Sequence, residues 1–244
     1  MKIDILTLFP EMCEAFLSES IIGRARKENK VEIACHNIRD YTLDKHNRVD
    51  DAPYGGGMGM VMSAQPIDDC LKAVIGNCEK KPRVIYLSPK GKTFDQAKAI
   101  ELSKLDRFVL LCGHYEGVDE RVLEKNVDEE ISIGNFVLTG GEIAAVTVAD
   151  AVSRLLPGVL SDDVCFSEES YWNGLLEYPQ YTRPAVWEGR EVPKVLLSGH
   201  HANITKWRRE QSLETTLKKR PEMLETAKLD DADKKYLEKL KALW

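Results

Sequence analysis

Glycines near the middle of the chain stand where they could admit a ligand to the backbone. Gly134 precedes a short apolar run at 136–138. Gly140 and Gly141 follow that run, directly before a helical pattern at 142–156. Because glycine has no side chain, the N–H and C=O groups of such turns can approach a ligand closely. Glycine also marks purely structural tight turns. The stretch therefore indicates either a main-chain ligand site or two turns in an α/β core.

Two other strand-like runs also end in turn residues. The run at 83–87 ends at Ser88-Pro89, and the run at 107–112 ends at Gly113. In open α/β sheets, ligands bind beyond the C-terminal ends of the strands, so the three loops would form one pocket if their strands are neighbours. Such a pocket suits a flat heteroaromatic ring such as adenine, with Glu116 accepting a hydrogen bond from a ribose or an ammonium group. The expected lining is Tyr86, Leu87, Pro89, Gly113, Tyr115, Ile133, Phe136 and Leu138.

A glycine-rich run at 55–59 has a different context. A dinucleotide fingerprint needs a strand directly before the run and a helix that opens on its last glycine. Here the sequence Asp-Asp-Ala-Pro at 50–53 precedes the glycines, and a Gly-Lys-Ser/Thr sequence does not follow them. Two acids beside a phosphate would repel it. The run therefore predicts a flexible loop that contacts a polymeric substrate or a partner subunit.

Two further features could supply catalytic groups. Arg154 stands near the end of the glycine-opened helix, where a cation is favoured for electrostatic reasons alone but could also reach a substrate oxygen. The segment at 160–170 holds four acids, Asp162, Asp163, Glu168 and Glu169. Acidic linkers are usually only solvated, but a carboxylate that becomes ordered when substrate binds could act as a general base.

Composition places the chain among cytoplasmic globular proteins. The 244 residues are 43% hydrophobic and 30% charged, which suffices for a substantial core and a charged surface. The first residues are too acidic and too short for a signal peptide, and we find no apolar run long enough for a membrane helix. The six cysteines lack Cys-x-x-Cys spacing, so the sequence predicts free thiols rather than a zinc site.

Charge is unevenly distributed along the chain. The net charge is −6, which argues against a protein that is basic throughout. Between Lys194 and Arg220, however, seven Lys or Arg face two acids. This local excess can attract phosphates, although a solvated helix face is the commoner meaning of a charge run. Lys206, Arg208 and Arg209 are the candidates for contact with nucleic acid.

Hydrophobic periodicity predicts the elements that position these groups. Strands are expected at 2–8, 31–38, 83–87, 107–112 and 131–133, alternating with helices at 10–27, 63–75, 95–103, 118–125 and 142–156. This alternation predicts an α/β fold whose mostly parallel sheet carries helices on both faces. A small all-helical C-terminal domain should follow, with Asn203 capping a helix at 204–219 and a last helix at 231–244. The predicted organisation is a domain at 1–160, a flexible linker at 161–172 and a helical domain at 173–244.

Several strings in one register resemble a known family. The chain is similar, almost end to end, to the bacterial tRNA (guanine-N1)-methyltransferases that act on the guanine 3′ to the anticodon, within the SPOUT class of knotted methyltransferases. The strings are KIDILTLFP, YGGGMGM, LSPKG, LLCGHYEGVDER, ISIGNFVLTGGE, SRLLPGVL, GLLEYPQYTRP and VPKVLLSGHH. Each string alone is weak evidence, but the set is highly specific.

The resemblance implies a deep C-terminal trefoil knot, which is exceptional among folds, and a homodimer whose active site is shared between subunits. It implies S-adenosylmethionine as the methyl donor, bound in the knot, and tRNA as the substrate. The binding residues it implies, with the pocket residues above, are Tyr86, Leu87, Ser88, Pro89, Gly113, Tyr115, Glu116, Ile133, Gly134, Asn135, Phe136, Val137, Leu138, Gly140 and Gly141.

The resemblance also assigns catalytic roles. Arg154 matches a family arginine at the guanine, and Glu169 occupies the position of the family's general base. That base is usually an Asp, so the carboxylate here is one methylene longer. The family is reported to use magnesium, but metal-ligand spacing in this sequence does not reveal a site.

Two rival functions predict different sequences. A Rossmann-type enzyme needs a glycine-rich turn after its first strand, where this chain has Phe9-Pro10. A non-catalytic RNA-binding module would account for the basic helix but not for the pocket loops. Calorimetric titration with S-adenosylmethionine and with NAD separates the three possibilities.

Overall fold

The computed structural model describes residues 1–76, 78, 80–160, 166 and 169–242. The chain divides into two compact units, Met1–Asp163 and Val164–Trp244. In the described part of the chain, we find no helix that combines the length and the hydrophobicity needed to cross a bilayer.

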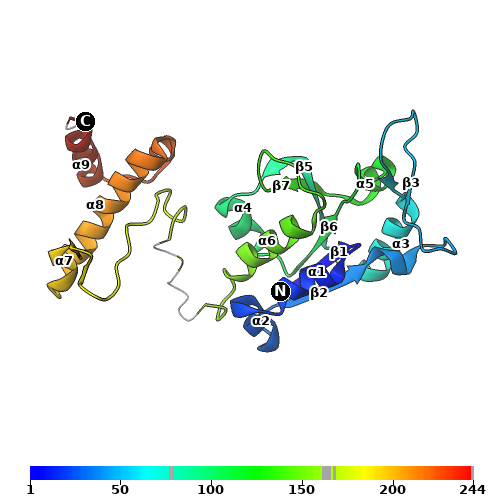
Figure 1. Cartoon of the computed structure of the whole chain (residues 1–244), viewed down its shortest axis with the longest axis horizontal. Coiled ribbons are helices and arrows are strands. Elements are labelled where there is room, and N and C mark those ends of the chain that lie inside the picture. The colour runs from blue at the N-terminus through cyan, green and yellow to red at the C-terminus, as the bar shows by residue number, and fades with distance from the viewer. Residues whose placement is uncertain (77, 79, 161–165, 167–168, 243–244) are drawn as a thin grey trace. The chain divides into compact units, whose positions relative to one another are not determined.

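A parallel sheet forms the centre of the first unit (Figure 1). Its strands lie in the order β2-β1-β6-β5-β7, and every pairing is parallel. Parallel strands need crossover connections, which the alternating helices supply. The strands are β1 (Lys2–Thr7), β2 (Glu32–Asn37), β5 (Arg83–Thr93), β6 (Arg107–Cys112) and β7 (Glu129–Ser132).

Helices cover both faces of this sheet, which confirms the predicted α/β class. Successive strand residues alternate between two cores, as in β6, where Leu110 packs in one core and Leu111 in the other. The first core receives α1 (Pro10–Leu17), α2 (Ser20–Lys27), α4 (Gln96–Leu102) and α6 (Glu142–Ser153). The second core receives the 3-10 helix η1 (Ile38–Tyr41), α3 (Ala64–Ile75) and α5 (Glu120–Asn126).

The predicted helix at 10–27 was wrong in one respect, because it is two helices. Leu17 and Ile22 are both buried against the sheet, yet on one continuous helix they would point about 140° apart. The helix is interrupted between Leu17 and Ser20, and the φ of Ser20 is +53°. Gly23 makes the break compact, since a Cβ there would lie 2.1 Å from the Ser18 carbonyl oxygen.

The strand β5 was predicted to end at Ser88-Pro89, but it continues to Thr93. Leu87 pairs with Ile131 of β7, and Lys92 pairs with the same residue, so residues 88–91 form a bulge between two paired segments. Proline is tolerated within a sheet at such bulges, where its missing N–H costs no ladder bond. Pro89 therefore lies in a bulge within β5 and does not end the strand.

A buried carboxylate ties three strands of the sheet together. Asp4 of β1 is fully buried, and it accepts hydrogen bonds of 2.8 Å from Arg107 Nε and from His36 Nε2. Burial raises the pKa of Asp4, but the hydrogen bonds from His36 and Arg107 outweigh burial and hold the pKa below 3.8. The carboxylate therefore stabilises the fold above the pKa of the unfolded chain, and this contribution is lost as the pH falls through the lower folded-state pKa.

Replacing Asp4 with asparagine should destabilise the protein by about 3 kcal/mol at pH 7, because Arg107 loses its buried partner. The difference from wild type should shrink below about pH 4, where the wild-type carboxylate is increasingly protonated. Urea unfolding at pH 7 and pH 3 measures both effects. Asp106→Asn, at an exposed position beside Arg107, is the matched control and should change stability little.

The second unit is mostly helical. It contains α7 (Lys194–Leu197), α8 (His201–Lys219), the 3-10 helix η2 (Pro221–Glu225) and α9 (Asp231–Ala242). Leu175, Leu213 and Leu237 form its buried core. Arg209 of α8 donates to Asp233 of α9 at 2.6 Å, so this pair joins the two helices.

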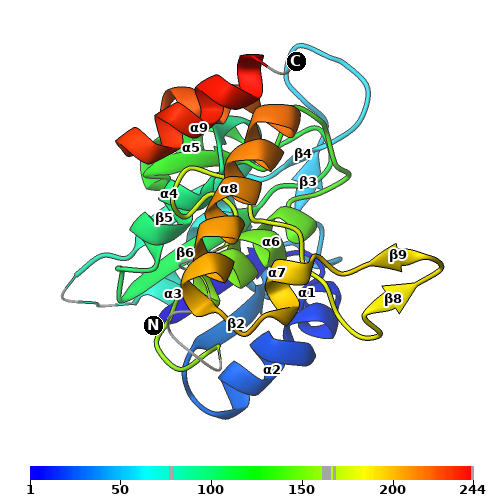
Figure 2. The same cartoon turned by 90° about the vertical axis from the view of Figure 1, so that its left-hand side faces the viewer.

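Two predictions for this unit were wrong. The helix α8 begins at His201, because the His200 carbonyl already accepts hydrogen bonds from the N–H groups of Asn203 and Ile204. Asn203 therefore lies inside the helix. The unit is also not all-helical, since β8 (Val186–Trp187) and β9 (Arg190–Glu191) form a hairpin, drawn in yellow in Figure 2. Strands of two residues are too short to produce a periodic signal.

Candidate active site

One cavity of about 310 Å³ lies where the loops after β5, β6 and β7 meet. The sheet makes this possible because β6, β5 and β7 are consecutive neighbours, and the C-terminal ends of parallel strands share one edge. The residues that the sequence led us to expect here line the cavity, with two exceptions. Gly134 and Asn135 are not part of the lining.

Close backbone packing shapes the cavity wall. The Gly141 N–H donates to the Gly113 carbonyl at 2.9 Å. A Cβ on Gly141 would lie 2.8 Å from Cys112 Cα, and a Cβ on Gly113 would lie 2.6 Å from Tyr86 Oη. Any side chain at either position would therefore push the loops apart or fill the space between them. Close packing therefore requires glycine at both positions, in addition to the access for a ligand that the sequence suggested.

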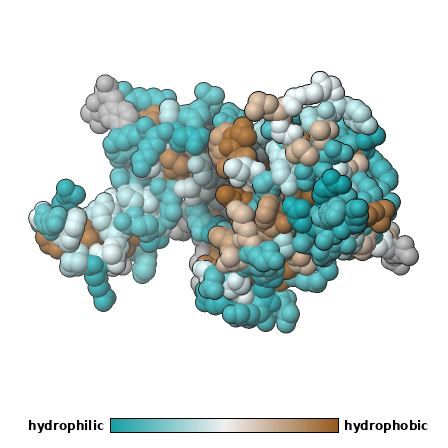
Figure 3. All heavy atoms as spheres, turned by 45° about the vertical axis from the view of Figure 1, so that its right-hand side comes forward, coloured by the Kyte–Doolittle hydropathy of each residue, from teal (hydrophilic) through white to brown (hydrophobic). Residues whose placement is uncertain are grey.

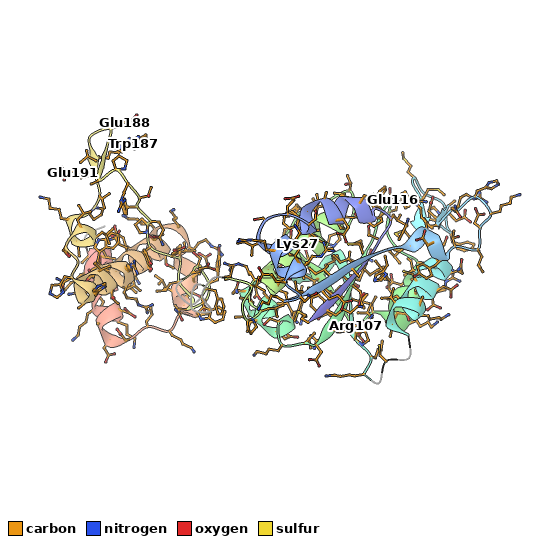
Figure 4. All side chains as sticks on the ribbon, turned by 90° about the horizontal axis from the view of Figure 1, so that it is seen from below. Lys27, Arg107, Glu116, Trp187, Glu188 and Glu191 are labelled. Carbon is orange, nitrogen blue, oxygen red and sulfur yellow. The ribbon has the colours of Figure 1, made fainter. Side chains whose placement is uncertain are left out.

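The loop after β6 is held by the segment that contains the glycine-rich run. The Glu116 N–H donates to the Met60 carbonyl at 3.0 Å, and the Met62 N–H donates to the Gly117 carbonyl at 2.9 Å. Gly59 has a φ of +83°, and a Cβ there would lie 2.5 Å from the Glu116 side chain. Glu116 is labelled on the first unit in Figure 4. The last glycine of the run thus leaves room for a cavity-lining carboxylate.

The rest of the glycine-rich run is open to solvent. Residues 53–59 form turns between β3 (Asp50–Asp51) and β4 (Val61–Met62). Tyr54 is 99% exposed and Met58 is 92% exposed. The helix α3 does not begin on the last glycine, so the geometry required for a dinucleotide loop is absent from this described segment.

A buried polar group behind the cavity was missed at the sequence level. Glu142, the first residue of α6, is 3% exposed and accepts a hydrogen bond of 2.7 Å from Thr7 Oγ1. Its other oxygen lies 3.8 Å from Nε2 of His114, which lines the cavity. Thr7 ends β1, far away in sequence, so only the fold brings it to this carboxylate. The sequence did offer a signal for this pair, because His114 follows Gly113 and Glu142 follows Gly141 directly.

The two expected catalytic residues, Arg154 and Glu169, belong to different units. Arg154 caps the C-terminal end of α6, whose N-terminal end lines the cavity. The twelve residues of α6 separate Gly141 from Arg154, a rise of about 20 Å along the helix. Burial raises the pKa of the nearby Asp150 carboxyl, and the Arg154 charge offsets this only in part.

Glu169 belongs to the second unit, where its N–H donates to the Phe166 carbonyl and its own carbonyl accepts from the Trp172 N–H. Asp162, Asp163 and Glu168 lie outside the described residues. The expected RNA-binding residues are all on α8. Lys206 is exposed, Arg208 stacks over the Tyr178 ring at 4.8 Å, and Arg209 is held by Asp233.

Exposed apolar side chains gather on α1 and α6, which pack against each other. Met12 and Phe16 are one helical turn apart on α1, and both are about half exposed. Phe9 before α1 and Ile143 on α6 extend this apolar surface. Figure 3 shows several hydrophobic side chains at the surface of the first unit. An exposed apolar surface of this kind is typical of a protein–protein contact.

Metal coordination has little basis in the described part of the chain. A search of those residues finds no group of three or more His, Cys, Asp or Glu side chains that could hold a metal ion. We therefore assign no residue to magnesium.

Comparison with known proteins identifies close relatives. The family model described as tRNA (Guanine-1)-methyltransferase TrmD matches residues 1–226. The tRNA (guanine-N(1)-)-methyltransferase of Ruminiclostridium cellulolyticum is 60% identical over 223 residues, which cover 91% of this chain and 96% of the relative. The protein of the same name from Clostridium perfringens (strain 13 / Type A) is 58% identical over 237 residues, 97% of this chain and 99% of the relative. The one from Alkaliphilus oremlandii is 54% identical over 247 residues, 99% of each chain.

Proposed function

Since this chain belongs to the tRNA (guanine-1)-methyltransferase family, we propose that it transfers a methyl group from S-adenosylmethionine to N1 of guanine at tRNA position 37, next to the anticodon. The observation that carries the proposal is the cavity that the loops after β5, β6 and β7 form together, in a chain that matches this family over residues 1–226. Because tRNA is the proposed substrate, we also propose that the reaction takes place in the cytoplasm.

The cavity suits the methyl donor in size and chemistry. Main-chain groups of Ile133 and of residues 136–141, with the aromatic and aliphatic side chains around them, would hold the adenine. The Glu116 carboxylate would accept hydrogen bonds from the ribose or from the ammonium group. S-adenosylmethionine supplies a methyl group on a positively charged sulfur. Membership of the family supports the further proposal that these loops form the SPOUT trefoil knot.

The base to be methylated needs activation. Guanine N1 carries a proton, and its lone pair is drawn toward the ring carbonyl, so it is a poor nucleophile until it is deprotonated. We assign proton removal to the Glu169 carboxylate. The Arg154 guanidinium would balance the negative charge that builds on O6. Holding N1, the methyl carbon and the sulfur in line supplies much of the remaining acceleration.

A homodimer would bring Arg154 to the reaction. Arg154 stands about 20 Å along α6 from the cavity of its own protomer, so we propose that each site uses the arginine of the other subunit. The exposed apolar side chains on α1 and α6 support a dimer contact on these helices. The second unit would bind tRNA, with exposed Lys206 and the stacked Arg208 facing the phosphates. Arg209 is the weakest of the three candidates because Asp233 already holds its guanidinium.

Methyl incorporation into two tRNA transcripts tests the proposed function. A transcript with guanine at position 37 should accept one methyl group, and a transcript with adenine there should accept none. Calorimetry should show binding of S-adenosylmethionine and no binding of NAD. Methylation of both transcripts, or NAD binding alone, would refute the proposal.

Gly141→Ala should weaken S-adenosylmethionine binding at least tenfold, because the added methyl group cannot lie 2.8 Å from Cys112 Cα without moving the cavity wall. Calorimetric titration measures the loss. Gly55→Ala is the control for the added methyl group, since no atom lies within 4 Å there, and the backbone strain expected at its φ of +86° falls on an exposed turn outside the cavity. Equal affinities for the two variants would show that the Gly113–Gly141 contact does not shape the donor site.

A further inference from the structure

The second unit carries a solvent-exposed arm, which contacts α8 near its start, where the ring centroid of Tyr181 lies 6.3 Å from that of Trp207. Residues 180–191 are all exposed, yet they contain the hairpin β8–β9, which stands out beside α7 and α8 in Figure 2. The turn residues Glu188 and Gly189 have φ values of +50° and +75°, as a two-residue hairpin turn requires. The Val192 N–H also donates to the Ala185 carbonyl at 2.9 Å. Local hydrogen bonds therefore shape the arm without help from a core.

Large apolar side chains on this arm face solvent. Trp187 is 58% exposed and Val186 is 54% exposed. A two-stranded hairpin is only marginally stable in water, and exposed aromatic groups on a projecting segment are typical of a binding surface. Figure 4 shows the labelled Trp187, Glu188 and Glu191 on the arm, away from the helices of the unit.

The pairing of the strands gives the arm two chemically different faces. Trp187 pairs directly with Arg190, and Val186 pairs directly with Glu191. Directly paired residues project from the same face of a sheet, and neighbours along a strand project from opposite faces. One face therefore presents an indole beside a guanidinium, and the other presents a valine beside a carboxylate.

The indole and guanidinium face matches nucleic acid better than protein. An aromatic ring stacks on an unpaired base, and an adjacent cation binds its phosphate or stacks as well. A second protein chain would need about 800 Å² on each side, far more than two side chains offer. The arm leads directly into α7 and α8, the segment from Lys194 to Arg220 with seven basic residues and two acids. The arm is therefore adjacent in the chain to a basic segment that would attract a polyanion.

We propose that Trp187 and Arg190 form a platform on which one unpaired base of the tRNA stacks, separate from the base at position 37. The proposal rests on the proposed function only in taking tRNA as the substrate. Trp187 then contributes to substrate affinity and has no part in methyl transfer itself. The platform adds a stacking contact to the phosphate contacts of α8, and it would select for a tRNA with an unstacked base within reach.

Substitutions on the two faces test the platform. Trp187→Ala should weaken binding of the tRNA transcript roughly tenfold, and Trp187→Phe should restore most of the loss, because stacking on a base needs an aromatic ring. Val186→Ala, on the opposite face, is the matched control and should bind tRNA like wild type. Arg190→Ala should reduce the slope of log affinity against log salt by about one. The full-length protein is used throughout, with S-adenosylmethionine affinity and kcat as readouts that should not change.

Fluorescence gives a second measurement. Added tRNA should quench wild-type tryptophan emission more than it quenches emission of Trp187→Phe, since stacking brings the base against the indole. Equal quenching in the two proteins together with unchanged affinity for Trp187→Ala would overturn the proposal. A change in sedimentation of Trp187→Ala, with tRNA affinity intact, would assign the arm to a second copy of the chain and also overturn it. A wild-type protein that binds tRNA with Trp187-dependent affinity but transfers no methyl group would refute only the proposed reaction.

Discussion

Glu169→Gln is expected to reduce kcat for methyl transfer at least hundredfold while the affinity for S-adenosylmethionine stays unchanged. A general base contributes about 10²–10⁴ to a rate, and glutamine keeps the shape of the side chain but cannot take up the proton of guanine N1. Single-turnover methylation of a guanine-37 transcript measures the chemical step, and calorimetry measures donor binding. Together they separate a lost base from a damaged site.

Glu169→Asp is the informative companion to this variant. It keeps the carboxylate, and it installs the residue that the family resemblance leads one to expect at this position. If Glu169 is the base, the aspartate variant should remain active while the glutamine variant does not. Full activity in Glu169→Gln would move the base to another carboxylate, and equal inactivity of both variants would point to a structural role for the segment.

Arg154→Ala is expected to lower kcat by a similar factor, about 10²–10³, because one preorganised positive group would no longer stabilise the charge on O6. Donor affinity should again be unaffected, since Arg154 stands at the far end of α6 from the cavity. Arg154→Lys keeps a positive charge without the planar fork of donors and should recover part of the rate. An Arg154→Ala protein with wild-type kcat would remove this residue from the mechanism.

A mixture of Arg154→Ala and Gly141→Ala tests whether the active site is shared, at a donor concentration low enough that Gly141→Ala alone shows almost no activity. In a dimer of one Arg154→Ala protomer and one Gly141→Ala protomer, a shared arrangement makes one site with both defects and one site with neither. Random re-association should then recover about a quarter of wild-type activity, because about half of the dimers are mixed and each has one intact site. If Arg154 served the cavity of its own protomer, the mixture would remain inactive.

Much of the fold could be predicted from the sequence because it depends on local patterns. Short apolar runs marked β1 and β6, and helical periodicity marked α3 and α6, each to within a few residues. The order of alternating strands and helices was enough for the α/β class. The turn residues after β5, β6 and β7 identified the loops that line the cavity, and the set of motif strings identified the family.

Local patterns failed where distant segments decide the outcome. Pro89 is a good strand terminator by propensity, but β7 pairs with β5 on both sides of the bulge and prolongs the strand to Thr93. The region at 10–27 has the pattern of one helix, but it forms two helices because Leu17 and Ile22 are both buried against the sheet.

The sequence by itself determined the family, the fold class and the candidate ligand-binding loops, because each is written in short-range patterns of residue type. The tertiary structure decided which groups meet. It placed the Thr7 hydroxyl on the Glu142 carboxylate beside His114, put Arg154 a full helix length from the cavity, and separated Trp187 from Val186 on the two faces of an exposed arm. These relations depend on strand order, helix length and pairing register, which are properties of the packed chain and not of any one segment.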